Sequence, residues 1–188
     1  MLRPANVVDL PTLRALIRDG AMTGSVDREL ASESREAALF FANLRQALAT
    51  GYFVEEEPLT GDLVTVAVPG YVYLPDGEAV DRPVGFGLFK AVAIGYELWL
   101  TGLATAWRGH GHGRAMLTAL LKTPPGKHTY VVRLNTEGRE SVAMGQLLLT
   151  LGYKCAQKTP QHTWYLRNDA PPELGQSFLT SQMPRMAN

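Results

Sequence analysis

A glycine-rich run in the second half of the chain constrains the fold most, because it has to join two regular elements through a turn. The run reads Trp107-Arg108-Gly109-His110-Gly111-His112-Gly113-Arg114. Residues 96–103 before it are aromatic and apolar enough for a buried strand, whereas residues 115–120 after it carry apolar side chains at helical spacing. A second strand-like segment follows at 130–134. The sequence therefore predicts a strand–loop–helix–strand unit with the glycines at the N-terminus of the helix.

Such a loop is suited to binding an anion. Unpaired backbone N–H groups and the positive end of the helix dipole meet there, and glycine lets a phosphate approach the backbone. The sequence of the loop excludes two common phosphate-binding motifs. Gly113 is followed by Arg114 instead of the Lys-Ser/Thr of a P-loop, and Arg114 also replaces the third glycine of the dinucleotide motif. From the loop alone, a tight surface turn is the alternative interpretation.

The spelling that fits is Arg-x-x-Gly-x-Gly, over Arg108, Gly111 and Gly113. It resembles the acyl-coenzyme A pyrophosphate loop of the GNAT superfamily of N-acetyltransferases. Other segments similar to this family are Leu2-Arg3-Pro4-Ala5 with Asp9-Leu10, Val84-Gly85-Phe86 and Leu151-Gly152-Tyr153. The resemblance covers about residues 2–166. It implies an α/β (α+β) fold, with a mixed, mostly antiparallel central sheet of about six or seven strands flanked by about four helices.

Local patterns predict the same order of elements. Four helices are expected: one that begins after the N-cap Asp9 and ends at Gly20, one that begins after the N-cap Ser34 and ends at Gly51, one after the glycine loop, and one at about 139–151 that Gly152 stops. Strands are expected at 1–5, 52–55, 63–68, 71–74, 84–91, 96–103, 130–134, 153–157 and 162–166. The dipeptide Asp76-Gly77 indicates a hairpin turn, and Pro124-Pro125 is expected to end the helix after the glycine loop.

Length and composition fit a single domain followed by a tail. The chain has 188 residues, of which 46% are hydrophobic, enough for one core. We expect a single acyltransferase domain at 1–167 and a C-terminal tail at 168–188. The 18 basic and 18 acidic residues balance, which argues against nucleic acid as the main partner. The single cysteine, Cys155, excludes an internal disulfide and a cysteine-based zinc site.

No apolar run approaches the roughly 18 residues that a membrane helix needs, and the N-terminus lacks the apolar segment of a signal peptide. We therefore expect a cytoplasmic protein with no membrane partner, and leave both a monomer and a homodimer open. His110 and His112 could share a metal ion, but no Asp, Glu or Cys lies close in sequence, so no metal site is expected.

The resemblance implies acetyl-coenzyme A as cosubstrate and direct transfer of its acetyl group to a primary amine. Backbone N–H groups over 109–114 would hold the pyrophosphate, the Arg108 and Arg114 side chains would add positive charge, and a backbone N–H near Leu103 would serve the thioester oxygen in the transition state. The expected cofactor-binding residues are Leu103, Ala104, Arg108, Gly109, His110, Gly111, His112, Gly113, Arg114 and Ser141, with Leu103 also counted as catalytic.

Glu97 is the expected general base. It precedes Arg108 by eleven residues, an offset at which some protein-lysine acetyltransferases of the superfamily place their glutamate, and an amine must lose a proton before it attacks. Strand alternation would put Glu97 on one face with Trp99, Thr101 and Leu103. A surface glutamate at a sheet edge is the alternative, and the run Glu55-Glu56-Glu57 offers other carboxylates.

The chain departs from the family at one step. The tyrosine that often protonates the departing thiolate falls on Leu148, and the family's helix-start asparagine falls on Ser141. Ser141, Tyr153 and Tyr165 are the nearest alternative hydroxyls. The first hypothesis is therefore an acetyl-coenzyme A-dependent N-acyltransferase, and the second is a catalytically weak acyl-coenzyme A sensor or scaffold of the same fold. A nucleotide-binding module of another class would rest on the glycine loop alone. The acceptor amine stays open.

Overall fold

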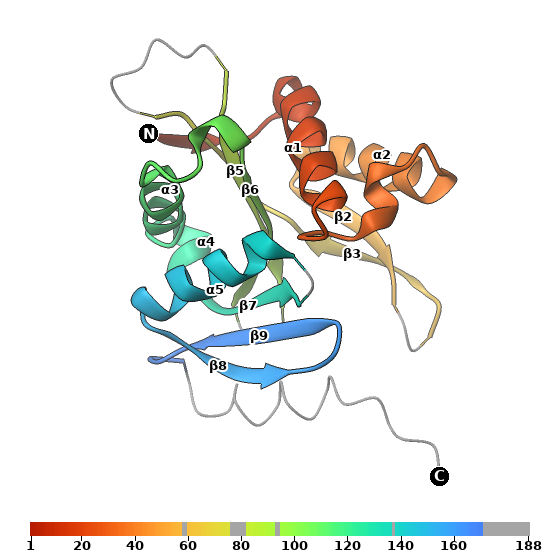
Figure 1. The fold of residues 1–188 in the computed structure, drawn as a ribbon. Coiled ribbons are helices and arrows are strands. Elements are labelled where there is room, and N and C mark those ends of the chain that lie inside the picture. The colour runs from red at the N-terminus through yellow and green to blue at the C-terminus, as the bar shows by residue number, and fades with distance from the viewer. Residues whose placement is uncertain (58–59, 76–81, 93–94, 137, 171–188) are drawn as a thin grey trace.

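A computed structural model describes residues 1–57, 60–75, 82–92, 95–136 and 138–170 of the chain (Figure 1). The turn expected at Asp76-Gly77 and most of the expected tail, from residue 171 on, lie outside the described residues. No helix in the described ranges has the length and hydrophobicity needed to cross a membrane. The domain boundary at 167/168 stays a prediction, and the last described strand ends at Arg167.

A seven-stranded sheet forms the centre of the molecule. Its strands are β1 (Leu2–Pro4), β4 (Gly70–Tyr73), β5 (Gly85–Ala91), β6 (Tyr96–Leu103), β7 (Thr129–Asn135), β8 (Tyr153–Lys158) and β9 (His162–Arg167). They are ordered β1-β4-β5-β6-β7-β9-β8, and only the β6–β7 pair is parallel. The hairpin β2 (Tyr52–Glu56) and β3 (Leu63–Ala67) forms a separate two-stranded sheet.

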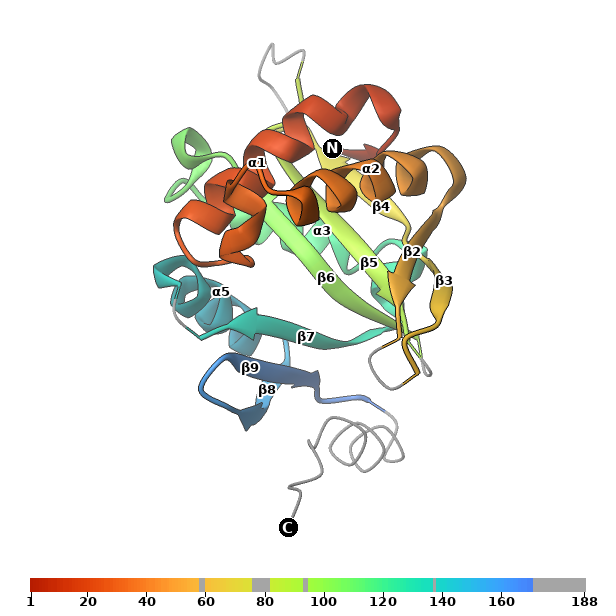
Figure 2. The same ribbon diagram turned by 90° about the vertical axis from the view of Figure 1, so that its right-hand side faces the viewer.

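Helices cover both faces of the sheet (Figures 1 and 2). The helices α1 (Leu10–Met22) and α2 (Arg35–Thr50) bury Leu13, Ile17 and Leu44 in a cluster with Phe86 and Leu88 of β5. On the opposite face, a second cluster is built largely from α3 (His112–Leu120), α5 (Arg139–Thr150) and the side chains of the sheet beneath them. A short helix, α4 (Pro124–Lys127), leads into β7. The described residues thus contain five α-helices where about four were expected.

Glycine allows α3 to lie close against the sheet. A Cβ atom on Gly87 of β5 would come within 2.7 Å of the Leu120 side chain, so any other residue at this position would require Leu120 or the helix that carries it to shift. Leu120 itself is completely buried in the second cluster. The position of α3, and therefore of its N-terminus, depends on this contact.

One expected boundary is wrong, and Asp9 and the two prolines occupy helix ends in a different role from the one expected. Helix α1 runs through Gly20 to Met22, because Gly20 is a packing position whose Cβ would lie 3.0 Å from Val26 Cγ2. Asp9 makes no side-chain cap on α1; its carboxylate instead accepts two hydrogen bonds from Arg3 and one from the Asn6 N–H. The prolines at 124 and 125 begin α4, where a missing N–H costs nothing, with Thr123 as N-cap.

Candidate functional site

The two parallel strands at the middle of the sheet separate along their length. Strands β6 and β7 pair only from Tyr96 to Leu98, opposite Thr129 to Val132. Further along β6, the Ala104 N–H donates to Val84 O at 2.8 Å, toward β5. Because backbone groups alternate in direction along a strand, those of Thr101 and Leu103 face the opposite side, where β7 has diverged. The separation therefore opens a gap that presents backbone groups of β6.

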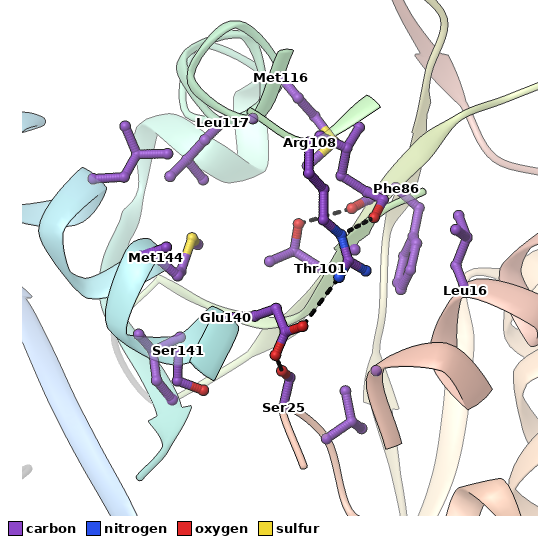
Figure 3. Close-up of a pocket in the computed structure, with 18 of the residues that line it drawn as sticks. Leu16, Ser25, Phe86, Thr101, Arg108, Met116, Leu117, Glu140, Ser141 and Met144 are labelled. Atoms are coloured by element: carbon purple, nitrogen blue, oxygen red, sulfur yellow. Dashed lines mark hydrogen bonds and ion pairs between the residues drawn. The ribbon is translucent and has the colours of Figure 1, made fainter. Parts of the chain in front are cut away.

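A pocket of about 290 Å³ fills this gap (Figure 3). Its wall is mostly apolar and comes from α1, β5, β6, α3, β7 and α5, so the pocket runs from one face of the sheet to the other. Glycine, alanine or serine occupies several wall positions, which keeps the space open. The wall contains Leu16, Ile17, Gly20, Ser25, Val26, Phe86, Thr101, Gly102, Leu103, Arg108, Gly109, Gly113, Met116, Leu117, Leu134, Glu140, Ser141, Ala143, Met144 and Leu147.

The glycine loop ends beside this pocket with unpaired donors. Gly109 and Gly111 have φ values of +82° and +86°, which L side chains rarely adopt, and a Cβ on either would point into open space. Gly111 is the N-cap of α3 without a side-chain cap, and the Ala115 N–H makes the first helical bond, to Gly111 O at 3.1 Å. The N–H groups of residues 112–114 are therefore left without helical acceptors. This is the geometry that binds a phosphate.

The loop side chains contribute less positive charge than expected. His112 packs against Trp107, with ring centroids 4.9 Å apart, and its Nδ1 is 3.4 Å from the Tyr73 hydroxyl. His110 is exposed, and the exposed Arg114 donates to Thr150 Oγ1 at 3.2 Å. The groups that could bind an anion at this loop are thus mainly its backbone N–H groups. In the described ranges, no three His, Cys, Asp or Glu side chains gather as metal ligands do.

The side chain of Arg108 does not point toward the N-terminus of α3 but lies along the pocket wall (Figure 3). Its Nε donates to Leu103 O at 2.8 Å, its Nη2 lies 2.7 Å from Asp19 Oδ2 on α1, and its Nη1 lies 3.2 Å from Glu140 Oε1 on α5. We call Asp19, Arg108 and Glu140 the clasp. Two carboxylates balance the guanidinium, which was expected to serve the pyrophosphate.

Sequence reasoning missed the partners of Arg108. Asp19 and Glu140 lie 89 and 32 positions away in the chain, and Ser25 Oγ, which donates to Glu140 Oε2 at 3.1 Å, is 115 positions from its acceptor. Burial alone would raise the pKa of Glu140, but hydrogen bonds from its own N–H and from Ser25, with the charge of Arg108, hold it below the usual value. Glu140 is therefore ionised at neutral pH. No short-range spacing marks these pairs.

Glu97 lies on the opposite face of the sheet from Leu103. A β-bulge opposite Leu88 and Phe89 inserts Trp99 into β6 and breaks the expected alternation. Trp99 packs against Phe53 in the α1/α2 cluster, at 5.1 Å between ring centroids, whereas Leu103 belongs to the α3/α5 cluster. Glu97 and Leu103 therefore do not share a face. The Glu97 side chain is 12% exposed, and burial raises its pKa.

The three candidate hydroxyls have different surroundings. Ser141, in the first turn of α5, lines the pocket. The Tyr153 hydroxyl donates to Thr129 O at 2.8 Å, and burial raises its pKa to about 12. The Tyr165 hydroxyl occupies the space where Gly145 of α5 would carry a Cβ. Leu148 is completely buried. Ser141 is thus the hydroxyl of the three that reaches the pocket.

The structure brings part of the predicted set into one wall: Leu103, Arg108, Gly109, Gly113 and Ser141. The other expected cofactor residues lie in the same loop or the adjoining helix end but outside the wall: Ala104, His110, Gly111, His112 and Arg114. Met144 and Leu147, which sequence reasoning did not single out for the site, follow Ser141 at helical spacing on α5. That spacing could have identified them.

No family model matches the sequence, and neither does any curated protein. Solved structures do match. An N-acetyltransferase from Thermoplasma acidophilum in complex with coenzyme A is 15% identical, with a TM-score of 0.57 over 89% of this chain and 98% of that one. A GNAT superfamily phosphinothricin acetyltransferase from Sinorhizobium meliloti in complex with AcCoA is 19% identical, with a TM-score of 0.57 over 89% and 86%.

A ribosomal-protein-alanine N-acetyltransferase from Brucella melitensis is 18% identical, with a TM-score of 0.56 over 88% of this chain and 97% of that one. The chain has the GNAT fold. At these identities the likeness establishes the fold. The mixed, mostly antiparallel sheet expected for the GNAT fold is confirmed, with seven strands.

Proposed function

We propose that the protein transfers the acetyl group of acetyl-coenzyme A to a primary amine by direct attack. The observation that carries this proposal is one pocket, between diverging β6 and β7, that leads from the N-terminus of α3 to backbone groups of β6. Two of the three solved neighbours named above are complexes with coenzyme A or AcCoA, which supports the same cosubstrate here.

The cosubstrate fits the site in two parts. The pyrophosphate would accept hydrogen bonds from the N–H groups of His112, Gly113 and Arg114 at the positive end of α3. The pantetheine arm would occupy the apolar pocket, whose volume of about 290 Å³ suits a narrow chain. The Leu103 N–H would donate to the thioester oxygen as charge develops on it. A donor of this kind is worth about 3 to 4 kcal/mol in the transition state.

Glu97 is the base of this proposal. A lysine-type amine has a pKa near 10.4, so it must lose a proton before its lone pair can attack the thioester carbon. Burial raises the pKa of Glu97, which makes its carboxylate a stronger base near neutral pH. Because Glu97 does not line the pocket, the proton would reach it through water.

The leaving group needs little help. A thiol with a pKa of about 8.5 departs tolerably as thiolate, so the leucine at position 148 does not block turnover. Ser141 lines the pocket and is available to donate a hydrogen bond to the sulfur. The second candidate function is a sensor that binds acyl-coenzyme A with weak turnover, and Leu148, where the family often has its acid, favours it.

The test compares Gly113→Val with Ala115→Val on the same helix. Gly113 lines the pocket, and a Cβ there would lie 3.9 Å from Leu103, which is ordinary van der Waals contact, so we expect the valine to fold and to fill ligand space. Ala115 is exposed and serves as the control. Acetyl-coenzyme A at 100 times its dissociation constant should stabilise the parent and Ala115→Val by about 2.7 kcal/mol, and Gly113→Val by much less.

Thermal melting and thiol release from acetyl-coenzyme A with an amine panel provide the readouts. NAD and ATP should not match the stabilisation by acetyl-coenzyme A. Equal stabilisation of all three proteins would disprove the pocket assignment. Stabilisation without thiol release for any amine would support the sensor instead.

A further inference from the structure

Four charged side chains from four strands meet on the α1/α2 side of the sheet, below the proposed thioester site. Glu55 comes from β2, Lys90 from β5, Glu97 from β6 and Arg133 from β7. They form two ion pairs: Lys90 Nζ lies 2.7 Å from Glu55 Oε2, and Arg133 Nε lies 3.5 Å from Glu97 Oε1. Within the described ranges, no hydrogen bond to the Glu97 carboxylate is found.

The pairing is not the one that strand register favours. Lys90 lies directly opposite Glu97 on the antiparallel neighbour, so these two side chains are the natural cross-strand pair. Glu55 holds the Lys90 ammonium instead. Arg133 lies two positions beyond Val131, the partner of Glu97 on β7, and therefore on the same face, where the strands begin to separate. Glu97 thus forms the longer ion pair with Arg133, while the close contact with Lys90 goes to Glu55.

That choice of partner suits a base. A carboxylate this buried needs a nearby cation to remain ionised, whereas a tightly hydrogen-bonded ammonium would make it too weak to take a proton. Burial raises the pKa of Glu97. The charges of Arg133 and Lys90 lower this pKa, and the charge of Glu55 raises it. His162 on β9 also faces Arg133; burial and that charge lower its pKa, so it is neutral at pH 7.

We propose that Arg133 is the positioning residue of the base: it holds the Glu97 carboxylate in place and ionised, while Glu55 prevents Lys90 from pairing with it more tightly. This inference rests on the role of Glu97 in the proposed function. Arg133 is not among the residues that line the pocket, and its ion pair is with Glu97, so we expect it to act through Glu97.

The experiment measures the ionisation of Glu97 directly and through catalysis. The Glu97 carboxyl carbon is followed by NMR in glutamate-labelled protein, with its signal assigned by its loss in Glu97→Gln. The pH profile of kcat is recorded alongside for Arg133→Gln, Arg133→Lys and Glu55→Gln. Lys154→Gln, which removes an exposed charge on β8, is the control for net charge.

Loss of the Arg133 cation should disfavour the charged carboxylate, so Arg133→Gln should move the Glu97 titration and the acid limb of kcat to higher pH. On the acid limb of the parent profile kcat should fall about tenfold, with recovery at high pH and an unchanged KM for acetyl-coenzyme A. Arg133→Lys should restore most of the parent profile. Glu55→Gln frees Lys90 to pair with Glu97 and should move the titration to lower pH.

Identical Glu97 titrations in the parent and Arg133→Gln would overturn the proposal, as would an equal shift in Lys154→Gln. If Arg133→Gln does not fold, Glu55→Gln and Arg133→Lys carry the test, and an unmoved titration in Glu55→Gln contradicts it. Absence of thiol release from the parent would instead refute the proposed function, because the NMR titration needs no turnover.

Discussion

Tyr153 shows how one hydroxyl can belong to the core even though it lies close in sequence to a position linked with catalysis. It follows the left-handed Gly152 that ends α5, and its ring is 2% exposed. The hydroxyl satisfies the backbone oxygen of Thr129, the first residue of β7, where the two parallel strands still pair. The contact stabilises the closed end of the gap, and Tyr153 does not line the pocket.

Tyr153→Phe should lower the free energy of unfolding by about 1 to 2 kcal/mol at neutral pH, because Thr129 O loses its donor in a buried place. The pKa of Tyr153 is about 12 in the folded protein against 10.0 for the free side chain. Its contribution is therefore complete below pH 10 and is lost as pH rises toward 12.

Urea unfolding of parent and variant from pH 8 to 12 checks this, with Tyr52→Phe, which changes an exposed ring, as control. The stability difference should narrow above pH 10. A constant difference across the range, or a hundredfold loss of turnover with binding intact, would contradict a purely structural Tyr153.

At this scale, the sequence predicted backbone chemistry better than side-chain chemistry. Positive φ at Gly109 and Gly111 follows from residue type and spacing, so the backbone geometry of the glycine loop could be predicted directly. The partners of the Arg108 guanidinium could not be predicted, because its acceptors on α1 and α5 come together only in the folded protein. The ion pair of Glu97 with Arg133 is likewise set by strand register across the sheet.

At the scale of elements, the position of α3 determines where the anion loop lies. The helix begins at His112, beside the loop, and ends at Leu120, which packs over Gly87. A change under the C-terminal end of α3 therefore tilts the helix and moves the donors at its N-terminus.

Gly87→Ala should destabilise the protein by about 1 to 3 kcal/mol, since its methyl group would be placed 2.7 Å from Leu120 atoms. It should also weaken binding of acetyl-coenzyme A, although Gly87 does not line the pocket. Leu120→Ala removes the obstructing atoms, so the double variant should be more stable than the sum of the single losses predicts. Urea unfolding of the four proteins measures the coupling, and strictly additive losses would refute the proposed contact.

Element order and most boundaries followed from hydrophobic periodicity and from glycine stops. The bulge at Trp99 could not be predicted in this way. Residues 96–103 have the pattern of an ordinary strand, and the extra residue is seen only when β6 is paired with β5. Likewise, a run of proline after an apolar helix fits both a stop and a new N-terminus. Tertiary packing at Thr129 and α4 decides between the two.

At the scale of the whole molecule, the central sheet consists of two halves. Strands β1, β4, β5 and β6 form one half, and β7, β9 and β8 form the other. They are joined by the short pairing between β6 and β7 at one end of the gap. The clasp joins them again at the other end, because Asp19 lies on α1 over the first half and Glu140 lies in the first turn of α5 beside the second.

Asp19→Asn should cost less than about 1 kcal/mol of stability, because the side chains of Asp19 and Arg108 are about a third exposed. It should nevertheless speed hydrogen exchange in peptides covering 101–108 and 138–145, which border the open end. Hydrogen exchange with mass spectrometry measures this. Glu33→Gln, which removes an exposed partner of Arg18, is the control and should leave both peptides unchanged. Unchanged exchange in Asp19→Asn would show that the clasp does not hold the halves together.

The separation of β6 and β7 also converts a small rotation between the half-sheets into a larger displacement at the open end of the gap. From Leu98, the last paired residue of β6, to Leu103 beside the clasp is five residues, or roughly 16 Å of extended chain. A rotation of only about 10° between the half-sheets would move their far ends apart by roughly 3 Å at that strand rise, about the length of two methylene groups. The size of acyl group that the pocket admits would then depend on an angle between two rigid bodies, and comparing acetyl- with butyryl-coenzyme A in Asp19→Asn would measure it.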